Sequence, residues 1–486
     1  MEITSLNRTS LQTIAMEASL KEPEQLWRQY FIAGSASLAV SSAGFLLGWT
    51  APVLVILDDP ELTPLPEPIT TDEGAWIGSL LTLAGLLGPF IGGYLSSTIG
   101  RKWSLLSVTL PILIGWILIA VATNVGFIYA GRLFWGVGLG MIFTLLPMYC
   151  AEVSTVDARG ALGSYLQTFM TFGTLFMYII GPFITYYEIV YVGVAYLALF
   201  TVSFFFMPES PTYHLLKNDR KAAADSLMRL RGRSLEGVQK ELDQINADVE
   251  ASKDNKPGTI ADVFRGKNFT AFYIGCALIT FQQFSGIHAV LFNMTAIFRA
   301  AGSNIEPAYA TIIVGAVQFA ASMMTQFVVD RLKRRTLLMI SSCGSAIALG
   351  LLGTYFLLAD LESPVVESIN FLPLLSLVMF MLAYCWGLGA LPFAIIGEIM
   401  PIEVKAFFTA FASALGSLTS FLITRFFSVI AEAVGHYVVF WIFAGSCVLS
   451  FLFTLFVLPE SKGKTFNEIQ DMLAGSSRKS KQDEKA

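Results

Sequence analysis

Twelve long apolar segments follow one another along the chain, separated by shorter polar ones. A transmembrane helix needs about 20 mostly apolar residues. Segments of that kind lie at residues 31–54, 75–98, 103–122, 126–147, 161–182, 189–207, 270–293, 308–329, 337–358, 372–396, 406–430 and 437–457. The pattern predicts an all-α membrane protein with twelve transmembrane helices. Because the number of spans is even, both chain ends are expected on the same side of the membrane.

The longest polar segment divides the spans six and six. We therefore expect five regions: 1–30, an N-terminal segment; 31–207, a six-helix bundle; 208–269, a linker; 270–457, a second six-helix bundle; and 458–486, a C-terminal tail. Within the linker, residues 219–250 contain no proline and carry Leu227, Leu230, Leu235 and Leu242 at loosely helical spacing. This spacing indicates short amphipathic helices, although a solvated charged linker has a similar composition.

Composition supports the membrane assignment and excludes several other classes of protein. Hydrophobic residues make up 55% of the chain and charged residues 14%, and the mean hydropathy of +0.64 is far above that of soluble domains. The five cysteines and three histidines are scattered, with no metal-ligand, disulfide or nucleophile-base pattern. We expect no enzyme activity, no cofactor, no metal and no nucleic-acid partner, only a small-molecule substrate and the lipid bilayer.

The distribution of basic residues among the loops predicts on which side of the membrane the chain ends lie. These residues are Arg101 and Lys102 after span 2, Arg159 after span 4, Arg331, Lys333, Arg334 and Arg335 after span 8, and Lys405 after span 10. The alternate loops at 55–74 and 359–371 hold acidic residues and neither Lys nor Arg. The positive-inside rule therefore predicts that both termini are cytosolic. The first apolar segment begins only near Phe31, so we expect no cleavable signal peptide.

Three groups of residues repeat in the same order in the two halves. Gly100-Arg101-Lys102 follows span 2, as Asp330-Arg331-Leu332-Lys333-Arg334-Arg335 follows span 8. Glu152 precedes Arg159 by seven residues and Glu398 precedes Lys405 by seven, while Pro-Glu-Ser follows span 6 at Glu209 and span 12 at Glu460. Repeats of this kind predict two pseudo-symmetric six-helix bundles. Transporters built from such repeats hold their substrate between the halves near the middle of the membrane and work by rocking about it.

Span 7 carries two glutamines, a glycine and a histidine inside an apolar stretch: Gln282, Gln283, Gly286 and His288. A buried amide without a partner costs about 2 to 7 kcal/mol, so protein, water or a polar ligand must satisfy these groups. On an unbroken helix Gln282 and His288 face different directions, because successive residues turn by about 100°. We therefore predict that span 7 is discontinuous near Ser285 and Gly286, and that its outer half moves.

Several motifs match one family in order and spacing. They are Gly131-Arg132, Pro147-x-Tyr149-x-x-Glu152 with Arg159-Gly160, Gln167, Pro208-Glu209-Ser210-Pro211, Gln282-Gln283-x-Ser285-Gly286, and Pro459-Glu460-Ser461-Lys462-Gly463-Lys464-Thr465. The chain resembles the sugar porter branch of the major facilitator superfamily, above all insect facilitated trehalose transporters and animal facilitative glucose transporters. The resemblance covers about residues 31–465. It implies the major facilitator fold with short cytosolic helices between the bundles, a monomer in the plasma membrane, and a sugar substrate moved by alternating access.

The resemblance also implies a sugar site. Its expected residues are Gln167, Gln282, Gln283, His288, Gln318 and Phe393, with hinges at Gly286 and Pro392. In related proteins an asparagine stands in the place of His288, a tryptophan in that of Phe393 and an asparagine in that of Gly416. The smaller side chains at Phe393 and Gly416 suit a disaccharide such as trehalose, although a hexose such as glucose fits equally. The alternatives are helix-to-helix hydrogen bonds for the polar residues, and lipid contact for Phe292 and Phe393.

The resemblance assigns a second group of residues to a gate at the cytosolic ends of the spans. The group comprises Arg101, Glu152, Arg159, Glu209, Arg334, Glu398, Lys405 and Glu460. Arginines and glutamates of opposite halves are expected to pair when the site faces outward and to separate when it opens inward. The alternative is that these residues only anchor the topology.

Span 1 indicates whether transport is coupled to protons. Proton-coupled members of the family carry a carboxylate there, where this chain has Thr50, and spans 1 to 6 hold no Asp or Glu at depth. Uniport is therefore the simpler mechanism; a proton symporter and a non-transporting sugar sensor are the alternatives. His288 is the one side chain at depth that titrates near neutral pH in water. It either acts as a neutral polar group or makes uptake fall at acid pH.

Overall fold

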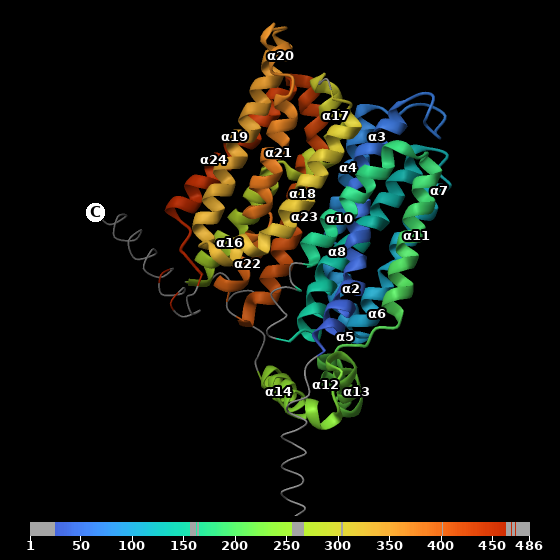
Figure 1. Cartoon of the computed structure of the whole chain (residues 1–486), viewed down its shortest axis with the longest axis vertical. Coiled ribbons are helices and arrows are strands. Elements are labelled where there is room, and N and C mark those ends of the chain that lie inside the picture. Colours follow the sequence, from blue (N-terminus) through green and yellow to red (C-terminus); the bar gives the residue numbers. More distant parts are fainter. Residues whose placement is uncertain are drawn as a thin grey trace, which may run out of the picture.

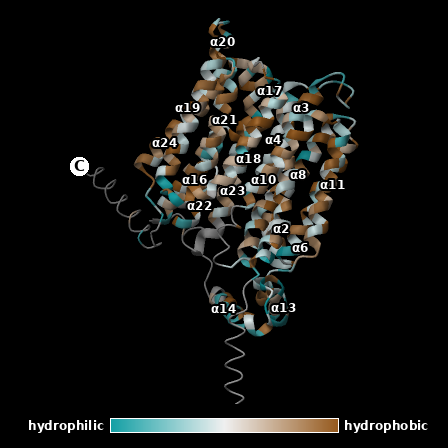
Figure 2. Ribbon diagram, in the orientation of Figure 1, coloured by the Kyte–Doolittle hydropathy of each residue, from teal (hydrophilic) through white to brown (hydrophobic). Residues whose placement is uncertain are grey.

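The structure of the protein is a computed structural model. It describes residues 25–155, 162, 165–254, 267–302, 305–400, 402–462, 468 and 472 (Figure 1). Within these residues, twelve helical segments are long and apolar enough to cross a membrane, which confirms the predicted number. Figure 2 shows hydrophobic residues along the spans and hydrophilic ones concentrated in the helices below them.

The first half of the molecule contains six spans, several of them built from two consecutive helices. They are α2 (Leu26–Gly48) with α3 (Thr50–Asp58), α4 (Thr71–Gly85) with α5 (Gly88–Thr98), α6 (Arg101–Ser107) with α7 (Thr109–Ala120), α8 (Val125–Val153), α10 (Tyr165–Ile180) with the short 3₁₀ helix η1 (Gly181–Phe183), and α11 (Tyr186–Phe205). The two-helix spans keep their direction, so each still crosses the bundle once.

The second half repeats this plan. Its spans are α16 (Lys267–Phe284) with α17 (Ile287–Ala301), α18 (Pro307–Arg331), α19 (Arg334–Asp360), α21 (Leu372–Trp386) with α22 (Leu391–Ile399), α23 (Ile402–Val434) and α24 (His436–Phe456). The short helix α20 (Val365–Ser368) lies in the loop between α19 and α21. The order and number of spans match the first half, as the sequence repeat predicts.

The part of the linker that the structure describes contains three helices: α12 (Pro211–Leu216), α13 (Arg220–Arg231) and α14 (Leu235–Asp254). Leu227, Leu230 and Leu242 are buried, whereas Leu235 is 50% exposed, so the predicted amphipathic face holds for three of the four leucines. Arg231 fastens these helices to the first half, since its guanidinium bonds Glu241 and donates to the Val153 carbonyl at 2.8 Å. The linker is therefore helical where the structure describes it.

The two ends of the bundle differ. We call the end that carries α12 to α14 the linker end, and the opposite end, which carries α20, the far end (Figure 1). Between the halves, α17 packs against α3, α4 against α23, and α10 against α18. The Tyr178 hydroxyl of α10 donates to the Leu291 carbonyl of α17 at 2.8 Å. These contacts close the far end.

Candidate functional site

Span 7 is broken where the sequence predicts it. Helix α16 ends at Phe284 and α17 begins at Ile287, with Gly286 between them at φ +78°. A Cβ atom on Gly286 would lie 2.3 Å from the Phe443 ring. Both the left-handed backbone and this contact require glycine, so the predicted discontinuity is confirmed. Movement at Gly286 remains a prediction.

Gln282 ties the break in span 7 to a second break in span 10. Its side chain is 5% exposed, and Nε2 donates to the carbonyls of Leu388 at 2.8 Å and Gly389 at 3.2 Å. Both carbonyls lie between α21 and α22, where the chain leaves the helix. Tyr384 interacts with the same side chain, but Oε1 receives no hydrogen bond of normal geometry among the described residues. The nitrogen thus joins two helices, and the oxygen is free to accept.

Gln283 makes a different set of contacts. Its Oε1 lies 2.9 Å from Nδ1 of His288, the second residue of α17. Its Nε2 faces Gly416 of α23, where a Cβ would lie 3.6 Å away. The structure therefore brings Gln283, His288 and Gly416 together, and a Cβ at Gly416 would also lie 3.2 Å from Ile279, so glycine allows α23 to approach this amide closely.

Gln167 and Gln318 lie on the facing helices α10 and α18, one from each half. Thr171 and Ser322 join these helices by a hydrogen bond of 2.7 Å. Since the helices are antiparallel, Gln167 lies one turn from this bond toward the linker end and Gln318 one turn toward the far end. Gln318 is 4% exposed and its Oε1 has no partner in the described chain. Gln318 thus offers an acceptor between the halves.

The two candidate aromatic residues differ in burial. Phe393 follows Pro392 in the first turn of α22 and is 44% exposed. Phe292 is fully buried, with its ring centroid 5.9 Å from that of His288 and 5.8 Å from the Arg132 guanidinium. The lipid-facing alternative is therefore wrong for Phe292, while stacking of Phe393 on a sugar remains a prediction.

Arg132 of α8 is a completely buried cation beside span 1. Nε donates to the Ile77 carbonyl at 2.7 Å and Nη1 to the Leu46 carbonyl at 3.1 Å. Nη2 donates to the Thr50 hydroxyl at 2.9 Å and to the Gly78 carbonyl at 3.3 Å. Among the described residues no carboxylate pairs with this guanidinium. Thr50, which stands where the resemblance leads us to expect a carboxylate in proton-coupled members of the family, thus supplies a hydroxyl that solvates Arg132.

At the linker end of the first half, the three predicted gating residues Arg101, Glu152 and Glu209 form one cluster with Ser210. Arg101 Nε lies 3.0 Å from Glu152 Oε2, and the Ser210 hydroxyl also donates to Glu152. Glu209 accepts from the backbone nitrogens of Arg101 at 3.0 Å and Lys102 at 2.9 Å. A carboxylate that accepts two N–H groups at a helix start stabilises that start.

The second half contains the same cluster. Arg334 Nε lies 3.4 Å from Glu398 Oε1, the Ser461 hydroxyl donates to Glu398, and Glu460 accepts from the backbone nitrogens of Arg334 at 3.0 Å and Arg335 at 3.2 Å. The sequence analysis missed Ser210 and Ser461, although both occupy the third place of the repeated Pro-Glu-Ser triplet.

These ion pairs lie within each half and not across the halves. Pairing across the halves is expected when the site faces outward, and that expectation remains a prediction. Arg159 lies outside the described residues. Lys405 lies on α23, but its side chain is outside the described part.

An ion pair between the halves lies at the far end. The Arg425 guanidinium of α23 bonds the Asp72 carboxylate of α4 and lies 4.6 Å from the centroid of the Trp76 ring. Trp76 also packs against Phe421 of α23 at 6.1 Å. We call Asp72, Trp76, Phe421 and Arg425 the far-end latch. The sequence analysis did not single out this pair, although an arginine near the end of span 11 and the acidic loop at 55–74 were the available signal.

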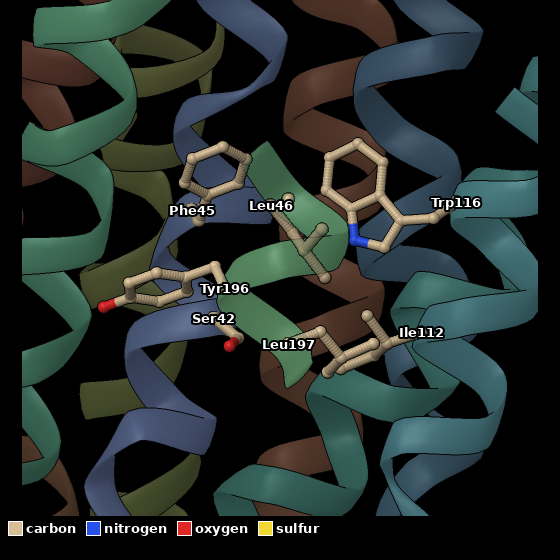
Figure 3. Close-up of a pocket in the computed structure, with 8 residues that line it drawn as sticks. Ser42, Phe45, Leu46, Ile112, Trp116, Tyr196 and Leu197 are labelled. Atoms are coloured by element: carbon tan, nitrogen blue, oxygen red, sulfur yellow. The ribbon is translucent and has the colours of Figure 1, made fainter. Parts of the chain in front are cut away.

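A small hollow in the first half can be set aside as a sugar site (Figure 3). It is almost wholly apolar and has no room for a sugar ring. Its lining residues are Ser42, Phe45, Leu46, Ile112, Trp116, Gly193, Tyr196 and Leu197. None of them belongs to the predicted site, which lies instead between the halves.

Sequence comparison finds relatives over most of the chain. The profile of the family described as "Sugar (and other) transporter" matches residues 34–473. The facilitated trehalose transporter Tret1 of Apis mellifera ligustica is 32% identical over 469 residues, covering 96% of this chain and 92% of that protein. Its counterpart in Bombyx mori is 32% identical over 93% of this chain and 88% of that protein. That of Anopheles gambiae is longer, and the alignment covers 57% of it.

Solved structures show the same fold. The partially occluded inward-open xylose transporter XylE from E. coli superposes with a TM-score of 0.74 at 23% identity, covering 90% of this chain and 99% of that one. A structure of XylE titled inward open gives a TM-score of 0.73 at 22% identity. The POT family transporter PepTSo reaches a TM-score of 0.63 at 12% identity. At these identities the likeness concerns the fold, and it confirms the predicted major facilitator architecture.

Proposed function

The chain belongs to the sugar (and other) transporter family, and we propose that it moves its sugar down a concentration gradient by uniport. Membership of this family means that the protein carries a sugar across a membrane and is not an enzyme. The proposals below concern whether transport is coupled to protons, which sugar is carried, and on which side of the membrane each end of the bundle lies.

The contact between Thr50 and Arg132 supports uniport. A proton-coupled carrier needs a group that loads and releases a proton at depth. The Thr50 hydroxyl does not titrate, and it already accepts a hydrogen bond from Arg132 at 2.9 Å. The remaining contacts of this guanidinium are backbone carbonyls and aromatic rings, so no proton carrier lies beside it in the described chain.

We propose trehalose as the sugar. The first matched relatives are named facilitated trehalose transporters. Gly416 lies next to the Gln283 amide and carries no side chain that could cover it, and Phe393 is exposed. The free acceptors of Gln282 and Gln318 suit hydroxyl groups, which donate as readily as they accept. A second sugar ring needs both the space and the additional polar contacts.

We also propose an orientation: the linker end is cytosolic, both termini lie on that side, and the protein works as a monomer in the plasma membrane. Arg101, Lys102, Arg334 and Arg335 lie at the linker end, as the positive-inside rule requires of a cytosolic face. In this orientation the closed far end is extracellular, and the structure represents a state in which the site is closed to the outside.

Counterflow in proteoliposomes tests the choice of sugar. Vesicles containing the purified protein are loaded with trehalose, glucose or fructose and diluted into a trace of the same labelled sugar. We expect transient accumulation of labelled trehalose that exceeds accumulation of the two hexoses. Counterflow of glucose without counterflow of trehalose would replace trehalose by a hexose as the substrate.

A further inference from the structure

A side-chain hydrogen bond bridges the break in span 7. Within the described chain it is the one side-chain bond from α17 to α16: Nδ1 of His288 lies 2.9 Å from Oε1 of Gln283. Gln283 belongs to the last turn of α16 and His288 to the first turn of α17, with Gly286 between them. The bond therefore links two helices whose relative direction is set at a single glycine.

The chemistry of the two groups fixes the direction of this bond. A carboxamide oxygen accepts and cannot donate, so the proton is on Nδ1 of His288. The bond holds the carboxamide plane of Gln283 and directs Nε2 away from the imidazole. In that direction lies Gly416 of α23, where a Cβ would be 3.6 Å from Nε2. Nε2 has no hydrogen-bond partner within the described chain, so it is an oriented donor next to Gly416.

The bond depends on the position of α17. This helix packs against α3 of the other half at the closed far end, and its Leu291 carbonyl accepts from Tyr178. If α17 swings away from α3 when the far end opens, His288 moves with it while Gln283 stays on α16. The Nδ1 to Oε1 contact would then be lost, and the carboxamide would be free to rotate.

We propose that His288 is a positioning residue: while the far end is closed, it holds the Gln283 carboxamide so that Nε2 donates to a sugar oxygen beside Gly416. This inference rests on the proposed sugar transport and specifies how its site works. The clamp acts in the state open to the linker end and is absent in the state open to the far end. It makes the affinity of the site for sugar depend on which side is open.

The experiment measures the two Michaelis constants of trehalose transport separately, by zero-trans exit from the linker end and zero-trans entry from the far end. In His288→Leu the donor is lost, and we expect the KM of exit to rise about tenfold, the effect of one lost hydrogen bond, while the KM of entry changes less than about twofold. His288→Asn is the matched rescue, because its Nδ2 occupies the place of the imidazole Nδ1. It should keep both constants within about twofold of the wild type.

Protein abundance and thermal stability are measured for each variant. If His288→Leu does not fold, His288→Ser carries the same expectation, since its hydroxyl is too short to reach Gln283. An equal rise of both Michaelis constants, no rise in either, or failure of His288→Asn to restore exit would each overturn the clamp while leaving sugar transport intact. A wild-type protein that moves no sugar would overturn the proposed function, and the clamp with it.

Discussion

Nη2 of Arg132 donates a hydrogen bond to the Thr50 hydroxyl at 2.9 Å, in the interior of the first half. Both residues are fully buried. The guanidinium is surrounded by three backbone carbonyls and by the rings of Trp49, Trp135 and Phe292. Span 1 thus contacts the buried cation Arg132 of span 4 through the neutral side chain of Thr50. This contact is the main structural support for uniport.

The first prediction concerns Thr50→Asp. An ionised carboxylate would form a buried ion pair with Arg132 that protonation weakens, so transport should become dependent on pH. We expect uptake by Thr50→Asp to rise at least about fivefold between pH 7.5 and about pH 4, where an aspartate carboxyl of ordinary pKa becomes protonated, and uptake by the wild type to change less than about twofold. Thr50→Asn is the uncharged control and should behave as the wild type. Equal pH profiles for all three proteins would show that this position does not govern coupling.

The second prediction concerns the far-end latch. Thr424 is 2% exposed and lies beneath the latch, where a Cβ on Gly78 would be 3.4 Å from its methyl group. In Thr424→Cys a membrane-impermeant maleimide should react only when the far end opens. We expect Asp72→Asn to accelerate this labelling about threefold to fivefold, because Arg425 loses its partner between the halves.

A second ion pair between the halves serves as the matched control. Arg299 and Asp58 lie 3.6 Å apart, with side chains 54% and 63% exposed. Water screens such a pair, so Asp58→Asn should change the labelling rate of Thr424→Cys less than about 1.5-fold. Equal acceleration by both variants would show that the labelling rate depends on the total charge at the far end and not on the far-end latch.

The third prediction compares the two linker-end clusters. Arg101 and Glu152 are 3.0 Å apart with side chains 10% and 16% exposed, whereas Arg334 and Glu398 are 3.4 Å apart with side chains 17% and 31% exposed. Loss of the more buried partner should be more destabilising. We expect Glu152→Gln to reduce stability by about 2 kcal/mol and Glu398→Gln by about 1 kcal/mol or less. Melting of the detergent-solubilised protein measures both, and the reverse order would contradict this comparison.

The fourth prediction concerns the break in span 7. Gly286→Ala introduces a Cβ at φ +78° and 2.3 Å from the Phe443 ring, so it should lower stability by about 2 kcal/mol or more and abolish most transport. Gly445→Ala is the control, because nothing lies within 4 Å of its added Cβ. It should melt and transport as the wild type. A neutral effect of Gly286→Ala would mean that α16 and α17 can join without the left-handed residue.

The sequence predicts those features of the fold that depend on the pattern of neighbouring residues. Apolar length predicts the twelve spans, the repeated Pro-Glu-Ser triplets predict two equivalent halves, and Gly286 beside Gln282 predicts the break in span 7. Leu235 shows the limit of this reasoning, because helical spacing alone cannot tell which leucine lies at the end of a helix and faces water. The buried face depends on what packs against it.

Contacts between distant spans could not be read from the sequence. Arg132 meets Thr50 because α8 packs against α2 and α3 in one particular register, and register between helices leaves little trace in either segment alone. The same holds for the two nitrogens of the glutamine pair: Gln282 bonds the break in span 10, while Gln283 faces Gly416. An unpaired arginine within an apolar span was the signal that should have prompted a search for its partner.

The most direct test of uniport measures sugar and protons in the same vesicles. Proteoliposomes that contain the wild-type protein and a trapped pH indicator are given an inward trehalose gradient, with and without a protonophore. We predict that trehalose enters until the concentrations are equal, that the internal pH stays constant, and that the protonophore leaves the rate unchanged. A pH change that accompanies each load of trehalose, or accumulation of trehalose driven by an imposed pH gradient, would contradict uniport.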